Sequence, residues 1–180
     1  MKYLSRLTLG VLLTFIIMSC ENDEDNSSPN NYIKYENKKY ELSQGYVMYN
    51  GPRGDVFRYN PVFYSSDIKV YGDSYVDSLS GNGNAIGFQL HTKRENLEGA
   101  YYEYQQDLTE DPYIFNGSLI VNANVENAAA NEIIISDGTL FIIKFGESYT
   151  FELEGTTENG KDISFYYKDS LTFYEDEGVQ

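Results

Sequence analysis

Residues 139–154, TLFIIKFGESYTFELE, decide the fold class of this chain, because their side chains follow a period of two. One face of the extended chain carries Phe141, Ile143 and Phe145, and the other carries Leu140, Ile142 and Lys144. After the turn residues GES, the alternation resumes with Tyr149, Phe151 and Leu153 on one face and Thr or Glu between them. This pattern predicts a half-buried antiparallel hairpin.

The same pattern continues to the end of the chain. Asn159-Gly160 is a strong hairpin signal, because both residue types accept the positive φ angles of a type I′ turn. The strand DISFYY (162–167) follows, and a last run, SLTFY (170–174), is expected to direct Leu171 and Phe173 inward. Residues 139–174 are therefore predicted to form a C-terminal four-strand meander.

Upstream, short alternating runs predict further strands. They are Tyr32–Glu36, Lys39–Ser43, Tyr46–Tyr49, Val56–Ser65, Ile68–Tyr71, Ala85–His91, Ala100–Gln105, Ser118–Val125 and Glu132–Ile135. The one helical segment expected is Asn124–Asn131, where alanines are concentrated. Short strands separated by Gly, Pro, Asn and Asp predict an all-β fold, either an antiparallel β-sandwich or a closed β-barrel. Residues 32–180 have the ordinary size of a single domain.

Charge and composition exclude several kinds of partner. The chain carries 13 Lys and Arg against 28 Asp and Glu. Nucleic acid is not expected to bind, since its affinity depends on basic groups that neutralise phosphates. Anionic membrane surfaces are disfavoured for the same reason. With a single cysteine and a single histidine the chain cannot assemble a zinc site of the usual composition. Asp67, Asp73 and Asp77 could supply oxygen ligands to calcium, but their spacing is not that of an EF-hand loop, and we expect no cofactor and no metal.

The N-terminal segment has the features of a secretory signal. Two basic residues precede an apolar run of twelve residues, Leu7–Met18. This run is too short for a membrane-spanning helix, which needs about 20 apolar residues. The tetrapeptide Ile17-Met18-Ser19-Cys20 resembles the bacterial lipobox. The resemblance implies that residues 1–19 are a lipoprotein signal peptide and that Cys20 becomes the diacylated first residue of the mature chain.

A polar tract, ENDEDNSSPNN, follows the cysteine. Because it holds no apolar side chain, residues 20–31 are predicted to be a lipidated cysteine and a flexible acidic tether. Its acids Glu21, Asp23, Glu24 and Asp25 resemble the export signal of surface-exposed lipoproteins of the Bacteroidota. The C-terminal rhythm of glycine turns and alternating aromatics, ending in DSLTFYEDE, is similar to that of small lipoproteins of the same group. The resemblance implies an outer-membrane lipoprotein, held through acyl chains on Cys20 and exposed at the cell surface.

Three classes of function remain open. The first is a non-catalytic binding or adhesion module for an extracellular glycan or protein. The alternatives are a small envelope hydrolase that uses paired carboxylates, and a scaffold subunit of an outer-membrane complex. A hydrolase could draw on acids concentrated in one stretch, which are Glu95, Glu98, Glu103, Asp107, Glu110 and Asp111. No serine-hydrolase elbow is present, and His91, at a strand end, is expected to lie on the surface or rim.

Tyrosine points most directly to a binding surface, with 18 residues against ten phenylalanines and no tryptophan. Consecutive side chains of a strand point to opposite faces, so Tyr101-Tyr102 and Tyr166-Tyr167 cannot each bury both rings in one core. We expect Tyr101 and Tyr166 on the polar face, together with Tyr32 and Tyr174. There the rings either pack as ordinary cross-strand pairs or form a ligand-contacting patch, since tyrosine combines an apolar face with a hydrogen-bonding tip.

Two tripeptides, Asp77-Ser78-Leu79 and Asp169-Ser170-Leu171, resemble the O-glycosylation sequon of exported Bacteroidota proteins. The resemblance implies that Ser78 and Ser170 are acceptors. Ser78 is the favoured acceptor because we expect it in a loop, whereas Ser170 is expected to begin a strand and to be shielded.

Overall fold

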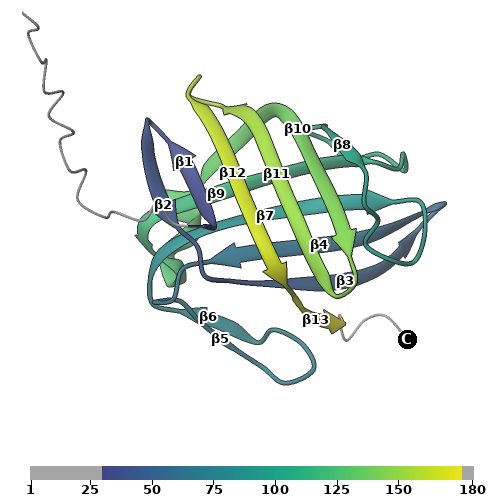
Figure 1. Cartoon of the computed structure of the whole chain (residues 1–180), viewed down its shortest axis with the longest axis horizontal. Coiled ribbons are helices and arrows are strands. Elements are labelled where there is room, and N and C mark those ends of the chain that lie inside the picture. The colour runs from purple at the N-terminus through teal and green to yellow at the C-terminus, as the bar shows by residue number, and fades with distance from the viewer. Residues whose placement is uncertain (1–29, 176–180) are drawn as a thin grey trace, which may run out of the picture.

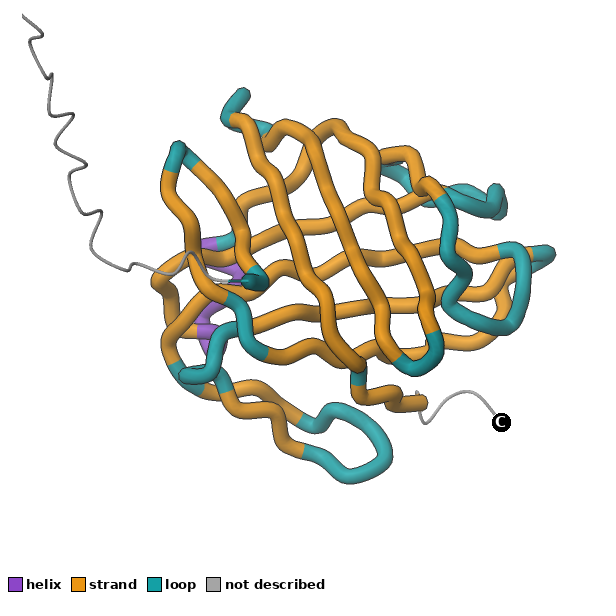
Figure 2. The backbone as a smooth tube through the Cα atoms, viewed as in Figure 1, coloured by secondary structure: helices purple, strands orange, loops and turns teal. Residues whose placement is uncertain are grey.

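The computed structural model describes residues 30–175, which are mostly strand (Figure 1, Figure 2). The strands are β1 (Tyr32–Tyr35), β2 (Lys38–Glu41), β3 (Gln44–Arg53), β4 (Val56–Tyr64), β5 (Lys69–Tyr71), β6 (Ser78–Ser80), β7 (Asn82–Thr92), β8 (Tyr101–Tyr104), β9 (Ile114–Asn124), β10 (Ile133–Phe145), β11 (Ser148–Thr157), β12 (Asp162–Ser170) and β13 (Thr172–Glu175). A 3-10 turn, Val125–Asn127, and the helix α1, Ala128–Asn131, confirm the predicted helical segment. The predicted signal peptide, Cys20 and the four acids of the tether lie outside the described residues.

Eleven strands form one mixed sheet in the order β13-β3-β4-β7-β9-β8-β10-β11-β12-β1-β2. The sheet curls over on itself, so that β10, β11 and β12 cross in front of β3, β4, β7 and β9 in Figure 1. The all-β prediction is confirmed. The architecture is an open half-barrel rather than a two-sheet sandwich or a closed barrel, because the end strands β13 and β2 each pair with one neighbour only.

The core fills the concave side of the curled sheet. In β10 the inward face is that of Leu140 and Ile142, whereas Phe145 on the opposite face is 86% exposed. In β11 and β12, the apolar residues that were predicted to share one face of each strand are buried: Tyr149, Phe151, Leu153, Ile163, Phe165 and Tyr167. Phe63 of β4 meets them across the core, with its ring centroid 4.8 Å from that of Phe151. Such contacts between the two layers hold the sheet in its curled form.

The predicted four-strand meander ends after three strands, and this prediction is wrong for β13. β10, β11 and β12 pair antiparallel in chain order, but β13 pairs parallel with β3 at the other end of the sheet, with Thr172 opposite Tyr46. Phe173, expected inward, is 48% exposed. β13 supplies hydrogen-bond partners to the edge of β3, which would otherwise be unpaired. β8 and β9 are also parallel, so the sheet is not purely antiparallel.

The turns of two hairpins differ in backbone conformation. Asn159-Gly160 connects β11 and β12 as predicted, but of these two residues only Gly160 has a positive φ (+73°), so the turn is not type I′. The Gly160 N–H donates to the Thr157 carbonyl at 2.7 Å, which closes a four-residue turn. The turn between β1 and β2 has the positive φ values of a type I′ turn, 49° at Glu36 and 62° at Asn37.

The convex face of β3, β4, β7 and β9 is covered by two different segments. At one end, β5 and β6 form a separate two-stranded sheet. Beside them, Ile68 and Val125 join Tyr46, Tyr64 and Ile120 in a second apolar cluster. At the other end the loop 105–112 folds over the sheet, where Asn116 Nδ2 donates to the Gln106 carbonyl at 3.2 Å. Between these segments and the strand ends, Asn50, Arg58 and His91 line a polar pocket that the loop 105–112 partly covers.

Candidate functional site

The convex face of the other layer carries an aromatic row that runs across five strands. Strand register places Tyr32 opposite Tyr166, Tyr166 opposite Glu152, Glu152 opposite Phe141, and Phe141 opposite Tyr101. All five side chains point away from the core, since they alternate with buried neighbours. With strands about 4.8 Å apart, the row spans roughly 19 Å from Tyr32 to Tyr101. Two aromatic pairs thus flank a carboxylate at the centre.

The two aromatic pairs are stacked. The rings of Tyr101 and Phe141 are nearly parallel, with centroids 4.2 Å apart and planes 17° apart. Those of Tyr32 and Tyr166 have centroids 6.2 Å apart and an interplanar angle of 24°. Lys39 Nζ lies 4.1 Å from the centroid of the Tyr32 ring. Stacking restricts the rotamers of these rings, so their outer surfaces are held in place before any ligand arrives.

An open hollow of about 500 Å³ lies along this row. We call it the aromatic hollow; its lining residues are Tyr32, Tyr101, Thr139, Phe141, Glu152, Glu154, Ser164, Phe165 and Tyr166. A second cross-strand row supplies its polar groups, with Glu154 opposite both Thr139 and Ser164. The hollow therefore combines the ring faces of the first row with the hydroxyl and carboxylate groups of the second row, which lies two residues away on the same strands.

The structure brings together three of the four tyrosines predicted to form a patch. Tyr101 is 63% exposed while Tyr102 is fully buried, and Tyr166 lies outside while Tyr167 is 1% exposed. Tyr174 does not join them: it lies on β13, with its ring edge-on to that of Tyr46 at 5.7 Å. Tyr174 was expected beside the other tyrosines because residues 170–174 were predicted to be the last strand of the meander. β13 pairs with β3 instead, at the other end of the sheet. Phe141 was not predicted as a site residue, because only the β8–β10 register reveals that it stacks on Tyr101.

The acids considered for hydrolysis are distributed among separate interactions. Glu95 accepts a hydrogen bond from the Tyr49 hydroxyl at 3.0 Å, and Glu98 forms an ion pair with Arg94. Glu103 accepts from the Thr139 hydroxyl. Among residues 30–175, no three His, Cys, Asp or Glu side chains are grouped closely enough to hold a metal ion. Asp111 accepts from the Thr109 hydroxyl at 2.8 Å, and Asp107 lines a separate polar pocket on the opposite layer.

His91 does not lie on the surface or rim, so that prediction is wrong. It is 2% exposed, because the loop 105–112 packs over it with the backbone of Thr109 and Asp111 against its imidazole. Burial lowers the pKa of its imidazole and is the largest influence on it. His91 lies on the convex face of β7, opposite the buried Leu90, and nothing in the local sequence indicates that a loop would cover that face.

The two predicted glycosylation serines are both exposed. Ser78 begins the short strand β6, where it pairs with Tyr71, rather than lying in a loop. Ser170 ends β12 instead of beginning a strand, and it is not shielded. Accessibility therefore does not favour Ser78 over Ser170.

No helix in the part of the chain that the structure describes is both long and apolar enough to cross a membrane. Comparisons of the chain with known protein families, with curated proteins and with solved structures found no match.

Proposed function

We propose that this protein is a non-catalytic binding module that holds an extracellular glycan in the aromatic hollow. The observation that carries the proposal is the aromatic row, in which two stacked ring pairs flank Glu152 on an exposed sheet face. We further propose that Cys20 carries acyl chains that anchor the module to the outer membrane, with the domain displayed at the cell surface.

The groups in the hollow match the chemistry of a sugar chain. A pyranose ring has apolar C–H faces, which pack against aromatic rings, and hydroxyl edges, which hydrogen-bond to carboxylates and hydroxyls. Tyr101 and Tyr166 supply ring faces, and Glu152, Glu154 and Thr139 supply polar partners. The row is elongated, so it suits several linked sugars rather than a single ring. Because the hollow holds two carboxylates, we infer that the glycan is neutral.

Alanine substitution in the hollow tests glycan binding. Tyr101→Ala and Phe141→Ala, prepared in the full chain, should weaken binding to neutral polysaccharides by about tenfold, since buried aromatic contacts dominate such interfaces. The measurement is affinity electrophoresis or calorimetry against glycans selected on an array. The melting temperature should change little, because a cross-strand aromatic pair contributes about 0.2–1 kcal/mol to stability.

Tyr71→Ala is the matched control for this experiment. Tyr71 is also an exposed strand tyrosine, 47% accessible, but it lies on β5 outside the hollow. It should leave glycan affinity unchanged. Glycan affinity that is equal in all three variants, or the absence of any glycan ligand, would contradict the proposal. A large loss of stability in Tyr101→Ala would show that the rings serve the sheet instead.

The anchoring proposal has its own test, independent of the hollow. Cys20→Ser should abolish labelling of the protein by a fatty-acid analogue, because oxygen cannot form the thioether. Replacing Glu21, Asp23, Glu24 and Asp25 by alanine should retain lipidation but make the domain inaccessible to protease on intact cells. Membrane partitioning of the serine variant, or undiminished protease access to the alanine variant, would each contradict the corresponding proposal.

A further inference from the structure

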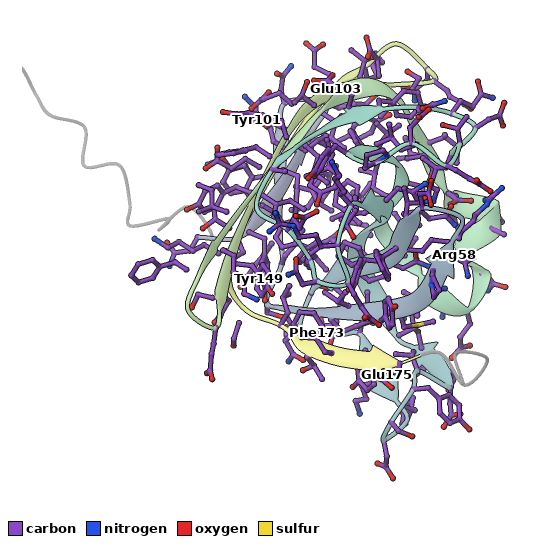
Figure 3. The ribbon with its side chains drawn as sticks, turned by 90° about the vertical axis from the view of Figure 1, so that its right-hand side faces the viewer. Arg58, Tyr101, Glu103, Tyr149, Phe173 and Glu175 are labelled. Carbon is purple, nitrogen blue, oxygen red and sulfur yellow. The ribbon has the colours of Figure 1, made fainter. Side chains whose placement is uncertain are left out.

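A polar pocket lies on the convex face of the opposite layer, at the ends of β3, β4 and β7. It is closed on one side by the loop 105–112 and has a volume of about 240 Å³. Figure 3 shows that Arg58, which lines it, lies on the side of the molecule away from Tyr101 and Glu103. The pocket is therefore separate from the aromatic hollow, and the inference below does not rest on the proposed function.

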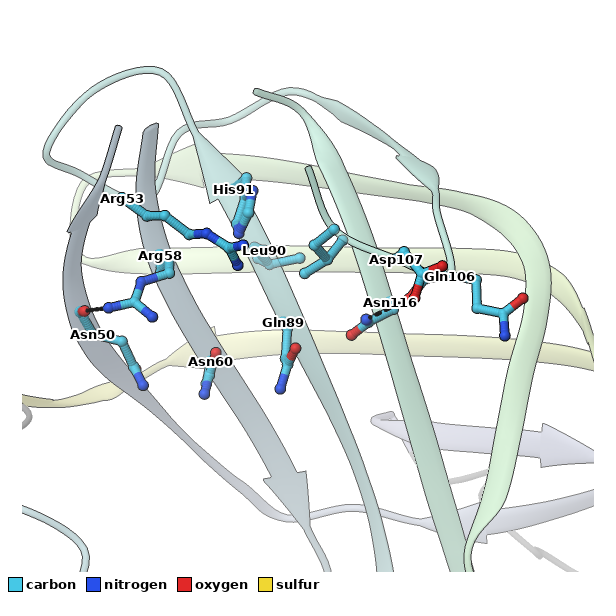
Figure 4. Close-up of a pocket in the computed structure, with 11 residues that line it drawn as sticks. Asn50, Arg53, Arg58, Asn60, Gln89, Leu90, His91, Gln106, Asp107 and Asn116 are labelled. Carbon is cyan, nitrogen blue, oxygen red and sulfur yellow. Dashed lines mark hydrogen bonds between the residues drawn. The ribbon is translucent and has the colours of Figure 1, made fainter. Parts of the chain in front are cut away.

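The pocket collects polar atoms that the fold buries without satisfying. Among residues 30–175, three buried side-chain nitrogen or oxygen atoms have no hydrogen-bond partner: Asn50 Oδ1, Arg58 Nε and His91 Nδ1. All three residues line this pocket (Figure 4). A buried polar group left without a partner is destabilising, so such groups are rare and their clustering is not expected by chance. These atoms need partners from outside the chain, which water or a bound ligand in the pocket supplies.

The pocket is also a local concentration of positive charge in an acidic protein. Arg53 and Arg58 both line it, with Asp107 as the one carboxylate in the lining. Within the described range, the ion pairs are Arg94 with Glu98 and Lys161 with Glu36, so neither pocket arginine forms an ion pair. Arg58 is held in place by donating from its guanidinium to the Asn50 carbonyl. Its Nε–H remains free to donate to a ligand.

We infer that this pocket binds the oxyanion group of a small polar ligand, through Arg53 and Arg58, beside the imidazole of His91. A guanidinium donates two parallel N–H bonds to a carboxylate, sulfate or phosphate, which suits the free Nε–H of Arg58. Asn50 Oδ1 accepts from a hydroxyl group of the ligand, which an acidic sugar or hydrogen phosphate carries, and the His91 imidazole contacts the remaining polar groups. The volume is below the roughly 300–1,000 Å³ of drug-sized sites, so the ligand is an inorganic oxyanion or a single acidic sugar.

His91 is the only histidine of the chain and serves as a built-in reporter. Its imidazole signals can be followed by NMR in the full chain while sodium phosphate, sodium sulfate or sodium glucuronate is added. Ionic strength is kept constant with sodium chloride, and glucose serves as the neutral match for glucuronate. We expect saturable shifts with at least one oxyanion and none with chloride or glucose. Tighter binding of glucuronate than of phosphate and sulfate would assign the oxyanion to an acidic sugar, and the reverse to a free ion.

Three arginine variants decide whether the shifts report this pocket. Arg58→Gln and Arg53→Gln should each weaken oxyanion binding at least about tenfold, whereas Arg94→Gln, outside the pocket, should not. Arg53 is exposed, so its variant retains the fold and decides the result if Arg58→Gln does not fold. The inference is overturned if no oxyanion produces a saturable shift, or if binding is unchanged in the Arg53 and Arg58 variants.

Discussion

His91 shows how a single residue acquires its properties from a distant segment. Its imidazole is removed from water by the loop 105–112, and desolvation lowers its pKa below the usual 6.5. Arg53 and Arg58 lower the pKa further by repulsion, while the backbone of Thr109 and Asp111 favours the protonated ring and opposes them. Asp107 is the other charged group of the pocket lining. His91 is therefore neutral in the folded protein at neutral pH.

This lowered pKa predicts a pH-dependent part of stability. Between the folded pKa and about pH 6.5, the unfolded chain binds a proton at His91 that the folded chain does not. The contribution is thus fully present above pH 6.5 and is lost as the pH falls through that window. His91→Gln should remove it, so the stability difference between wild type and variant, measured by urea unfolding from about pH 8 to about pH 5, should shrink on acidification. Parallel stability curves for the two proteins would contradict this.

At the scale of the element, β10 runs without interruption through a sequence that would ordinarily end a strand. Ser136-Asp137-Gly138 contains the residues of a turn, yet β10 continues from Ile133 to Phe145. The register with β11 shifts between Ile135 and Asp137, which marks a β-bulge, and Gly138 has a φ of 149° there. The bulge is possible because Gly155 faces it: a Cβ at Gly155 would lie 2.3 Å from the Asp137 carbonyl oxygen.

Gly155→Ala should therefore destabilise the protein by about 1–3 kcal/mol, because backbone atoms must move to admit the methyl group. The measurement is the free energy of unfolding by urea. Gly87→Ala in β7 is the matched control, since its Cβ would meet nothing nearer than a Val62 methyl at 3.6 Å. We expect that control to be neutral or slightly stabilising, by about 0.4–1 kcal/mol. Equal effects of the two substitutions would contradict the close contact at the bulge.

At the scale of the whole molecule, the curled sheet makes one core out of strands that are far apart in sequence. Its buried cluster joins Ile33 of β1, Phe63 of β4, Leu90 of β7 and Phe151 of β11. Neither layer of the curled sheet can bury its apolar face alone, because the side chains that cover it come from the other layer. The described residues therefore have no boundary at which one part could unfold and leave the rest intact.

We accordingly predict a single cooperative unfolding transition for the full chain. Circular dichroism should report loss of β-structure, and tyrosine fluorescence should report loss of side-chain packing, since the chain has no tryptophan. The two signals should follow the same denaturant curve. Two separated transitions would show that residues 32–180 are not one domain.

Local sequence alone determined most of the elements and the faces of several strands. Alternation placed Tyr101 outside and Tyr102 inside, and likewise Tyr166 and Tyr167, since neighbouring side chains of a strand point to opposite faces. Alanine-rich residues 124–131 include the helical segment that was predicted there. These outcomes depend on backbone geometry, which acts between residues adjacent in the chain.

Only the tertiary structure decided which strands are neighbours and what covers them. β10 is apolar on both faces, so alternation could not show that Leu140 rather than Ile143 enters the core. β13 pairs with β3, Phe141 stacks on Tyr101, and a loop buries His91. Each of these outcomes depends on hydrogen bonds or packing between segments distant in sequence. A period of two determines the face of a residue, but not the partner that it meets there.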